Sequence, residues 1–518
     1  MKAHLMYRDQ DFDLAATLPE NEVELTQDLD LNTLFQAMSL GDKFLFEVSR
    51  RAVLSSLTDP ATIAYRQHIL DDCTCYPDVI REMYAVSVAA VEGERAIWAP
   101  FRKSPSSTLR RSVEALQLFV RSLKRLRQIA EDQGGAFRSE GLVALVNMLR
   151  QELDDGYFQT IDEYLQRLKL RDGIVISAEL SKGNKGVGHV LRTPGNTKQG
   201  WKEWIGIGLR SSYSFEVSPR DDAGLRALSE LADRGTTLVA NALAQSTDHI
   251  LSFFTMLCSE LGFYVSCLNL RGQLVEREVA TCTPVPLPWT PPALAFNGLF
   301  DVCLSLRMEG PIVGNDAHAN GKSLVMITGA NSGGKSTFLR SMGLSQLMMQ
   351  CGMFVTAQSF ASSVCEGLFT HFIREEDSRM RSGRLDEELS RMSVIADELT
   401  PRSMVLFNES FAATNEREGS ELARQTVRAL LEAGIKILFV THLHDLAHKY
   451  YRQHLESALF LRAERLADGR RTFRMVEAEP LPTSYGEDLY HRLGGWMSDK
   501  TLPVPSGEAG LEGGSPGS

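Results

Sequence analysis

The chain has 518 residues, of which 43% are hydrophobic and 23% are charged. Such a composition can bury a large core, so it excludes a disordered scaffold, and the length predicts about two to four domains. The formal net charge is −11. This sign argues against a general polyanion binder, because nonspecific affinity for nucleic acid comes mainly from cationic side chains that displace counterions. Any contact with nucleic acid is therefore expected from a local patch.

No window of about 18 apolar residues is evident, and the first residues lack a basic region followed by an apolar core. We therefore expect neither a membrane span nor a signal peptide, which predicts a cytoplasmic protein. The eight cysteines lie in apolar stretches without the spacing of a zinc site or a disulfide framework. They are expected to be free and buried thiols.

The first half of the chain has the apolar periodicity of helices. From Leu31 to Lys169 apolar residues recur at helical spacing, and the same pattern returns from Ala223 to about Leu270. Between them, residues 173–217 alternate short apolar runs with Gly, Lys and Asn clusters, a pattern typical of hairpins. The sequence thus predicts a mostly α-helical core and lever domain, in which two helical arms flank a small β insertion.

A cluster of prolines between Pro284 and Pro292 breaks any helix and marks a predicted domain boundary. An alternating α/β pattern follows this cluster. We therefore predict a multidomain protein with a helical domain at residues 1–285 and an α/β domain at residues 286–497. Residues 498–518 are rich in Gly, Pro and Ser and are expected to form a disordered tail.

A phosphate-binding loop stands between a strand and a helix in the second half. Residues 324–328 are a short apolar run, residues 329–336 match the GxxxxGKS pattern, and a helical pattern follows. Glycines let backbone N–H groups curl around phosphate oxygens, Lys335 neutralises the β and γ phosphates, and the Ser336 hydroxyl ligates Mg²⁺. The residues predicted to bind ATP here are Gly329, Ala330, Asn331, Ser332, Gly333, Gly334, Lys335, Ser336 and Thr337.

A second apolar run, residues 403–407, ends in Asn408 and Glu409. A carboxylate just past such a strand can orient or activate the attacking water, so Glu409 is predicted to be the catalytic base. Asn408 stands where Asp normally binds Mg²⁺. It keeps an oxygen ligand without the negative charge, which predicts weaker Mg²⁺ binding and slow hydrolysis. An apolar run before a carboxylate is by itself more often a plain strand end, and the upstream phosphate loop favours the catalytic interpretation.

A third strand, Ile435 to Val440, precedes Thr441 and His442. An imidazole at this strand end could contact the γ-phosphate and sense its loss. The alternative is a capped strand terminus with a satisfied histidine. The two motifs already described favour the sensor role for His442, and His444 has the weaker claim.

Together these stretches resemble the MutS family of DNA mismatch-repair ATPases, which are relatives of ABC-type nucleotide-binding domains. The similarity lies in the amino-acid sequences and the order of segments between residues 297 and 495. These segments are TGANSGGKSTFLRSMG, FVTAQ, FTHFIREEDSRMRSGR, MVLFNES followed by TNEREGSELA, FVTHLHDLA and TSYGEDLYHRLGG. It is weaker upstream, where three segments look like the family's core and lever helices: DLDLNTLFQAM, SSLTDPATIAYRQHIL and LAQSTDHILSFFTMLCSELGFYV.

The resemblance implies an ABC-type, MutS-like P-loop ATPase domain whose nucleotide sites form between two subunits, and hence a homodimer. By the same matching, Gln358 is similar to the loop residue that couples the γ-phosphate to the helical arms. Asn315 falls in a stretch that lies near the adenine. Four residues match positions that face the partner subunit or lie in the dimerisation region: Thr414, Ser484, Tyr485 and Gly486.

Three departures from the family pattern bear on function. Ser382-Gly383-Arg384 is followed by Leu385-Asp386-Glu387-Glu388 instead of a Ser-Thr pair, and acidic groups facing a triphosphate would repel it. Asn408 replaces the usual Asp. The chain starts almost directly in the core helices and has no Phe-x-Glu wedge in its opening residues. Mismatch reading by an inserted aromatic ring is therefore not expected.

Two groups of cations are candidates for DNA contact. One lies in a helical stretch and is as often just a solvated face: Arg110, Arg111, Arg121, Lys124, Arg125 and Arg127. The other lies in the β insertion, where the tip of a clamp would sit: Lys182, Lys185, Arg192, Lys198 and Lys202. The second group is the better candidate, because it combines cationic hairpins with a position at the end of an arm. Its contacts would go mainly to phosphates.

These observations predict a MutS-like, ATP-dependent DNA-binding ATPase with ATP and Mg²⁺ as cofactors and duplex or branched DNA as partner. ATP binding and hydrolysis would move the lever and clamp on DNA, in DNA repair or recombination. The alternative is a nucleotide-gated module that binds a protein partner and no DNA. The acidic net charge and the lack of a Phe-x-Glu wedge for mismatch reading favour this alternative. An ATPase subunit of a transporter is a third interpretation, and the helical first half argues against it.

Overall fold

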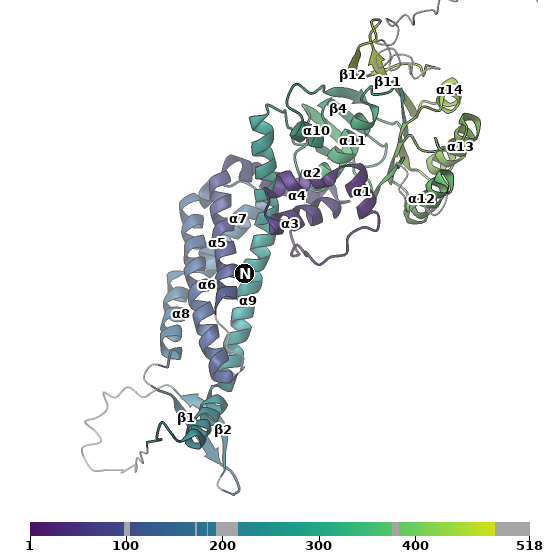
Figure 1. The fold of residues 1–518 in the computed structure, drawn as a ribbon. Coiled ribbons are helices and arrows are strands. Elements are labelled where there is room, and N and C mark those ends of the chain that lie inside the picture. The colour runs from purple at the N-terminus through teal and green to yellow at the C-terminus, as the bar shows by residue number, and fades with distance from the viewer. Residues whose placement is uncertain (98–103, 171–172, 184, 193–215, 375–382, 482–518) are drawn as a thin grey trace, which may run out of the picture. The chain divides into compact units, whose positions relative to one another are not determined.

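The computed structural model describes residues 1–97, 104–170, 173–183, 185–192, 216–374 and 383–481 (Figure 1). The chain divides into two compact units. Unit 1 comprises Met1–Pro288, Val302–Met308 and Leu344–Thr356, and unit 2 comprises Trp289–Asp301, Glu309–Gly343 and Ala357–Ser518. Two short segments from beyond the boundary predicted at residue 285 thus belong to unit 1. The tail predicted at residues 498–518 lies outside the described residues.

Unit 1 consists mainly of helices, in line with the periodicity of the first half. Its helices are α1 (Glu22–Asp28), α2 (Leu31–Ser39), α3 (Lys43–Leu54), α4 (Pro60–Cys75), α5 (Pro77–Ala96), α6 (Pro105–Gln133), the 3-10 helix η1 (Gly134–Ala136), α7 (Glu140–Glu152), α8 (Asp155–Leu168), α9 (Asp222–Glu276) and α10 (Val302–Arg307). Its strands are β1 (Val175–Leu180), β2 (Gly186–Arg192) and β3 (Val285–Leu287).

Local sequence signals set where several of these helices begin. The Asp59 side chain accepts hydrogen bonds from amides of the first turn of α4, and Pro60 follows it. Ser104 and Ser107 form a reciprocal capping box at the start of α6, again with a proline, Pro105, in the first turn. Such side chains satisfy amides that have no partner inside the helix, and proline fits there because it has no N–H to satisfy.

The long helix α9 is the central element of unit 1. It packs against α5 and α6, which run beside it (Figure 1), and the rings of Phe119 and Phe254 have centroids 5.6 Å apart. By length and composition alone, α9 is apolar enough to cross a membrane, whereas the sequence had suggested no such window. Of its most apolar window, 72% is buried inside the structure. Packing against other helices therefore accounts for the apolar character of α9.

The β insertion begins as an antiparallel hairpin of β1 and β2, which contacts α9. This close approach requires a small residue on the helix, because a Cβ on Gly235 would lie 2.5 Å from the side chain of Ile176. The rest of the insertion, residues 193–215, is outside the described part of the chain.

A buried carboxylate holds the N-terminal segment of the chain against α9. Glu260 is fully buried, and its two oxygens accept hydrogen bonds from the backbone N–H groups of Leu5 (2.6 Å) and Phe12 (3.1 Å). Tyr264, one turn further along, donates to the carbonyl oxygen of Leu5. Burial raises the pKa of Glu260 to about 7. The two backbone hydrogen bonds keep the carboxyl group satisfied inside the core.

Unit 2 contains two sheets and the helices that cover the larger one. Its strands are β4 (Leu294–Leu299), β5 (Asn315–His318), β6 (Leu324–Gly329), β7 (Ser359–Ser363), β8 (Leu368–Phe372), β9 (Met404–Asn408), β10 (Lys436–Val440), β11 (Ala458–Arg465) and β12 (Arg471–Glu477). Its helices are α12 (Arg384–Glu398), α13 (Glu416–Glu432), α14 (His444–Arg452) and the first part of α11 (Lys335–Gln350).

The larger sheet has the strand order β12-β11-β6-β10-β9-β8. The strands from β11 to β8 are mutually parallel, and β12 pairs antiparallel with β11. Helices α12, α13 and α14 cover one face, and α11 lies on the other (Figure 1). Parallel strands covered on both faces are almost continuous apolar runs, which explains the sequences LVMI, MVLF and ILFV. The smaller sheet includes β7-β4-β5, all antiparallel.

A hydrophobic core fixes the central strands against α12, α13 and α14. Side chains alternate between the two faces of a strand, so Val405 and Phe407 of β9 point to the same face as Ile437 and Phe439 of β10. The rings of Phe407 and Phe439 are stacked with centroids 5.0 Å apart. This packing sets the relative positions of the strand ends, where the predicted functional residues lie.

The role of Glu260 can be tested by replacing it with Met. The change leaves the N–H groups of Leu5 and Phe12 buried without an acceptor, which should reduce the free energy of unfolding by about 2–5 kcal/mol. Urea denaturation measures this loss, and hydrogen exchange of residues 1–16 should become faster. The exposed Glu230 on the same helix provides the control, because Glu230→Met should change stability by less than about 0.5 kcal/mol. Equal unfolding midpoints for the two variants would contradict the role of Glu260.

Candidate nucleotide-binding site

Three segments singled out from the sequence meet at one edge of the larger sheet. The phosphate loop follows β6, His442 follows β10, and Glu409 follows β9. In the sheet, β10 lies between β6 and β9 and is parallel to both. The carboxyl ends of parallel strands meet at the same edge, which is where open α/β sheets bind their ligands. The strand order therefore brings the three segments together.

The backbone of the phosphate loop depends on its glycines. Gly329 (φ +117°) and Gly334 (φ +89°) have positive φ angles, which glycine adopts without steric cost. A Cβ on Gly329 would lie 2.9 Å from the backbone nitrogen of Ala463, and a Cβ on Gly333 would lie 2.9 Å from its Cβ. The loop is thus packed directly against β11, and any larger residue at these positions would displace it.

Lys335 is buried at the start of α11. Its Nζ atom donates hydrogen bonds to the carbonyl oxygens of Gly329 (3.2 Å) and Ala330 (3.0 Å), so the amine is held inside the loop. Burial lowers the pKa of Lys335, and the nearby Glu409 carboxylate opposes this change. A cation at the N-terminus of a helix matches the charge of a phosphate group.

The two residues predicted to ligate Mg²⁺ lie in contact. The hydroxyl of Ser336, in the first turn of α11, donates a hydrogen bond over 2.9 Å to Oδ1 of Asn408, the last residue of β9. Oxygen atoms are the ligands that Mg²⁺ prefers, so this donor set fits the ion. Because both oxygens are neutral, the pair supplies one negative charge less than a Ser-Asp pair would.

Glu409 and His442 face each other at the ends of β9 and β10. The Nε2 atom of His442 lies 3.1 Å from Oε1 of Glu409. This hydrogen bond lowers the pKa of Glu409, whereas burial opposes the effect. Glu409 is therefore a carboxylate at neutral pH. The side chains of His442 and Glu409 are 26% and 33% exposed, so a ligand at the phosphate loop can reach both.

The strand β12 brings an aromatic ring to the loop that sequence reasoning missed. Phe473 is 49% exposed, and a Cβ on Gly334 would lie 3.4 Å from its ring. Asn315 holds this strand in place, because its Nδ2 donates to the carbonyl oxygen of Phe473 (3.2 Å) and its Oδ1 accepts from the N–H of Met475 (2.7 Å). Both ends of the Asn315 amide thus bind backbone groups of β12, and its contact with a nucleotide stays a prediction.

A second cation, Arg471, also lies near the loop. Its charge contributes to lowering the pKa of Lys335, which places the two cations within electrostatic range. The Nε and Nη2 atoms of Arg471 are buried and have no hydrogen-bond partner among the described residues. Guanidinium N–H groups without acceptors beside a phosphate loop fit an anionic ligand. Nothing in the sequence around Arg471 distinguished it from the other arginines.

The remaining predicted residues of unit 2 have other partners in the structure. The backbone N–H of Gln358 donates to Asn297, and its side chain packs on Gly298; among the described residues it forms no hydrogen bond with the phosphate loop. The hydroxyl of Thr414 donates to Glu418 in the first turn of α13. Five predicted residues lie outside the described part of the chain: Lys198, Lys202, Ser484, Tyr485 and Gly486.

Comparison with known families agrees with this geometry. A family model described as MutS domain V matches residues 325–491, which contain the phosphate loop, Glu409 and His442. A second model, described as the MutS2 N-terminal domain, matches residues 58–277 of the helical half. The chain belongs to the MutS family.

Three relatives illustrate the extent of the similarity. The chain is 24% identical to MutS protein homolog 4 of Homo sapiens over 249 residues, which are 46% of this chain and 25% of the relative. It is 31% identical to the DNA mismatch repair protein MutS of Lactobacillus helveticus over 223 residues, 40% of this chain and 26% of the relative. For MutS of Thermotoga maritima the values are 34% over 161 residues, 30% and 20%. The chain thus spans about a quarter or less of the length of the relatives it matches.

The acidic stretch after Gly383 differs from its prediction in this MutS-family chain. Ser382 lies outside the described residues, but Glu388 is 5% exposed, and its Oε2 accepts a hydrogen bond from the backbone N–H of Phe411 over 2.6 Å. Glu388 is therefore not available to face a triphosphate, whereas Asp386 of the same segment is exposed. Helical spacing places it on the buried face of α12 together with Met392 and Ile395, and this period is visible in the sequence.

A buried histidine connects α12 with the loop that carries Glu409. The ring of His371 is fully buried; its Nδ1 lies 2.7 Å from Oγ of Ser410, and its Nε2 lies 3.0 Å from the carbonyl oxygen of Glu388. Burial lowers the pKa of His371 to about 4, so the ring is neutral at physiological pH. Because a carbonyl oxygen only accepts, the proton is on Nε2. The one hydroxyl proton of Ser410 is shared between Nδ1 and the carbonyl oxygen of His371, which lies 2.6 Å from Oγ. Sequence reasoning missed this pair, although both residues lie at the ends of neighbouring strands.

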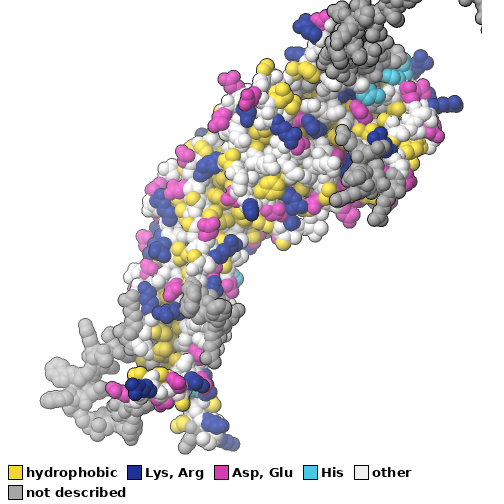
Figure 2. Space-filling view, in the orientation of Figure 1, with side chains coloured by type: hydrophobic (Ala, Val, Ile, Leu, Met, Phe, Trp, Pro, Cys, Tyr) yellow, Lys and Arg dark blue, Asp and Glu magenta, His cyan; other side chains and the backbone are white. Residues whose placement is uncertain are grey.

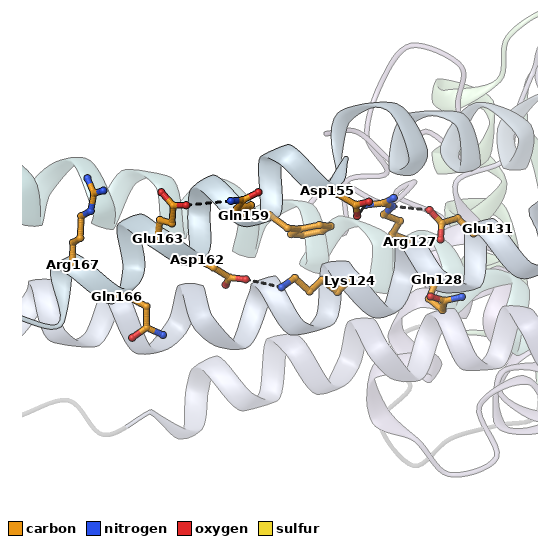
Figure 3. A pocket seen from close by; sticks show the side chains of 11 residues that line it. Lys124, Arg127, Gln128, Glu131, Asp155, Gln159, Asp162, Glu163, Gln166 and Arg167 are labelled. Carbon is orange, nitrogen blue, oxygen red and sulfur yellow. Dashed lines mark hydrogen bonds and ion pairs between the residues drawn. The ribbon is translucent and has the colours of Figure 1, made fainter.

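Most of the cations predicted on the helical stretch are paired with acids inside unit 1. Figure 3 shows Lys124 bound to Asp162 of α8 (2.7 Å) and Arg127 bound to Glu131 and Asp155. The pairing continues along α6, where three other arginines have acidic partners: Arg110 with Glu114, Arg111 with Glu94, and Arg125 with Glu82. The solvated-face interpretation therefore describes α6 better than a DNA contact does.

The cations of the β hairpin have a different environment. Lys182, Lys185 and Arg192 are exposed, and none of them forms an ion pair with another described residue. Arg192 donates a hydrogen bond to the hydroxyl of Ser177 (2.9 Å). Figure 2 shows positively charged side chains at this end of unit 1. The described part of the insertion keeps its cations available to an anionic partner.

The buried state of His371 predicts how stability depends on pH. In the unfolded chain His371 has a pKa near its ordinary value of 6.5 and is protonated below that pH. In the folded chain the ring is protonated only when the pH falls to about 4. Its contribution to stability is therefore complete above pH 6.5 and is lost as the pH falls toward 4. Between these values the native chain should lose up to about 1.4 kcal/mol per pH unit more than His371→Phe.

Chemical denaturation of both proteins at several pH values between 4 and 7 measures this difference. Titration of the histidine Cε1–H signal by NMR gives the pKa of His371 independently. Identical pH slopes for the two proteins would contradict the buried neutral state.

Proposed function

We propose that this MutS-family chain is an ATP-dependent DNA-binding ATPase that acts in DNA repair or recombination. The observation that carries the proposal is the convergence of the phosphate loop, Glu409 and His442 at the ends of three adjacent parallel strands. The names of the relatives, MutS protein homolog 4 and DNA mismatch repair protein MutS, support the assignment to DNA metabolism. Binding and hydrolysis of ATP is the chemistry that the site supports.

The residues of the loop would hold the triphosphate. Its glycine-shaped backbone directs N–H groups toward phosphate oxygens, and Lys335 neutralises their charge. The oxygens of Ser336 and Asn408 would hold Mg²⁺, which when bound shields the charge of the phosphates. Because Asn408 is neutral, we propose weaker Mg²⁺ binding and slower turnover than an aspartate would give.

Glu409 is the proposed general base. Its hydrogen bond with His442 keeps it ionised, so it can accept a proton from the attacking water. His442, bound to this carboxylate and next to the loop, is placed to respond when the γ-phosphate leaves. Phe473 offers an exposed ring on which a purine base can stack, and Arg471 offers a second cation.

A covalent connection supports coupling between nucleotide binding and the helical unit. The helix α11 begins with Lys335 in unit 2, and its last residues belong to unit 1. There, the backbone N–H of Leu57 donates to the carbonyl oxygen of Gln350, and Nε2 of Gln350 donates to the carbonyl oxygen of Leu57. Arg66 donates to the carbonyl oxygen of Cys351. We propose that movements of the loop reach the helices of unit 1 along α11.

The proposed DNA contact lies on the β1–β2 hairpin. Lys182, Lys185 and Arg192 are exposed there without acidic partners, unlike the paired cations of α6. Such cations bind phosphates with little sequence preference. We further propose a homodimer, in which the surface around Thr414 faces the second subunit.

The second candidate function is a nucleotide-gated module that binds a protein partner and no DNA. The net charge of −11 and the internal pairing of the α6 cations favour it. The nucleotide chemistry would be the same in both cases, so direct DNA binding discriminates between them.

Two substitutions test the nucleotide chemistry separately. Lys335→Ala removes the buried cation and should weaken ATP binding by about 100-fold. Glu409→Gln should keep ATP binding and slow hydrolysis by about 100- to 10,000-fold, because it removes the base but little volume. Titration with a fluorescent ATP analogue and a phosphate-release assay measure the two properties. Glu432→Gln, on the surface of α13, is the control; normal hydrolysis by Glu409→Gln would exclude Glu409 as the base.

The DNA contact is tested by the double variant Lys182→Ala/Lys185→Ala. If both amines contact phosphates, the slope of log affinity against log salt should decrease by about 2. Fluorescence anisotropy with duplex, branched and single-stranded DNA at several salt concentrations measures the slope. The matched control is Lys124→Ala/Arg125→Ala, which removes two cations that are already paired and should leave the slope unchanged. Absence of salt-dependent binding to every DNA would favour the protein-interaction module.

A further inference from the structure

The segment that carries Glu409 has an unusual backbone. Glu409 (φ +57°) and Phe411 (φ +65°) both adopt the left-handed conformation, although neither is glycine. Side chains with a Cβ populate this region rarely, and such conformations persist where the surrounding structure determines them. The groups around residues 409–411 must therefore hold this short loop in place.

Glu388 of α12 forms the first of these restraints. It is buried, and its Oε2 accepts a hydrogen bond of 2.6 Å from the N–H of Phe411. A carboxylate buried in an apolar face is costly unless its oxygens are bound, so the hydrogen bond to Phe411 offsets the cost of burying Glu388. Arg391, one turn further along α12, donates to the carbonyl oxygen of Phe372 at the end of β8 (2.9 Å). The helix is thus attached both to β8 and to the loop.

His371 forms the second restraint. It joins the carbonyl oxygen of Glu388 on one side to the hydroxyl of Ser410 on the other, and its ring stacks on Phe411 with centroids 5.7 Å apart. Ser410 is the neighbour of Glu409 in the chain. Through these contacts α12, β8 and the loop form one connected and buried network.

The opposite side of the loop is closed by α13. A Cβ on Gly419 would lie 2.3 Å from the carbonyl oxygen of Phe411, so the helix backbone leaves no space into which the loop could move. The N–H of Glu409 itself donates to the carbonyl oxygen of Val440 (2.9 Å). The network of Glu388, His371 and Ser410 therefore restrains the loop that carries Glu409.

We propose that Glu388 and His371 are positioning residues for ATP hydrolysis, which hold the Glu409 carboxylate in its catalytic position through Phe411 and Ser410. This inference rests on the proposed function, because it takes Glu409 to be the general base. A base that is displaced by about 1 Å can lose about 100-fold in rate, whereas binding of the triphosphate depends on the phosphate loop. Loss of the network should consequently change kcat and leave nucleotide affinity intact.

The test compares Glu388→Leu with Glu388→Gln. Leu has a similar size and cannot accept the hydrogen bond from Phe411, so kcat should fall by about 10- to 100-fold. Gln keeps an acceptor oxygen and should restore most of the rate. In both variants KM and the affinity for the ATP analogue should stay within about twofold of the wild type, as expected for an interaction that matters only in the transition state. Asp397→Leu, exposed on the same helix, is the control and should retain full activity.

Ser410→Ala provides a second variant with a smaller change, in case Glu388→Leu does not fold. It removes the hydroxyl that links His371 to the loop and should also lower kcat with KM unchanged. Thermal unfolding of each variant identifies those that are folded. Wild-type kcat in folded Glu388→Leu or Ser410→Ala would overturn the inference.

The outcomes separate this inference from the proposed function. If Glu409→Gln is inactive while Glu388→Leu and Ser410→Ala hydrolyse ATP normally, Glu409 remains the base and the positioning role is excluded. If Glu409→Gln hydrolyses ATP normally, or the unaltered chain does not hydrolyse ATP, both proposals fail. A parallel loss of kcat and of nucleotide affinity in Glu388→Leu would indicate a general structural role and would also exclude the inference.

Discussion

The parallel alignment of β6, β10 and β9 is the constraint on which the nucleotide site depends. Their carboxyl ends meet at one edge of the sheet, so the phosphate loop, His442 and Glu409 become neighbours without any long-range motif having to encode their distance. The hydrophobic core between the sheet and α12, α13 and α14 keeps the strands in register. Packing in unit 2 and the chemistry at its edge are consequently parts of one arrangement.

The charges at this edge are balanced by few groups. Lys335 is buried among the carbonyl oxygens of its own loop, Glu409 is bound by His442, and the Mg²⁺ position has two neutral oxygens. An anionic ligand would complete this balance, because the cations Lys335 and Arg471 outnumber the nearby carboxylate. The backbone at Glu409 and Phe411 is held in a rare conformation, which ties the chemistry to the packing of α12 and α13.

In unit 1 most cations of α6 are paired with acidic side chains. Along α6 nearly every cation has an acidic partner, and these exposed pairs contribute little to stability while they remove the attraction for polyanions. The hairpin cations Lys182, Lys185 and Arg192 form no ion pair with another described residue. The DNA contact proposed for this acidic chain is therefore a local one. The same feature leaves the protein-binding alternative open to direct test.

The sequence by itself determined the parts of the protein that are encoded in contiguous stretches. The phosphate loop, the strand ends at Glu409 and His442, the helical first half and the start of the β insertion could all be predicted, because their signals depend on neighbouring residues or on a fixed period. Other features depend on contacts between distant positions. Glu388 and Phe411 are 23 residues apart, His371 and Ser410 are 39 apart, and Asn315 and Met475 are 160 apart. Only the tertiary structure decided that Glu388 binds Phe411, that Asn315 holds β12, and that most cations of α6 are paired. Hydrogen bonds and ion pairs of this kind need complementary groups at a short distance, and only the folded chain brings them together.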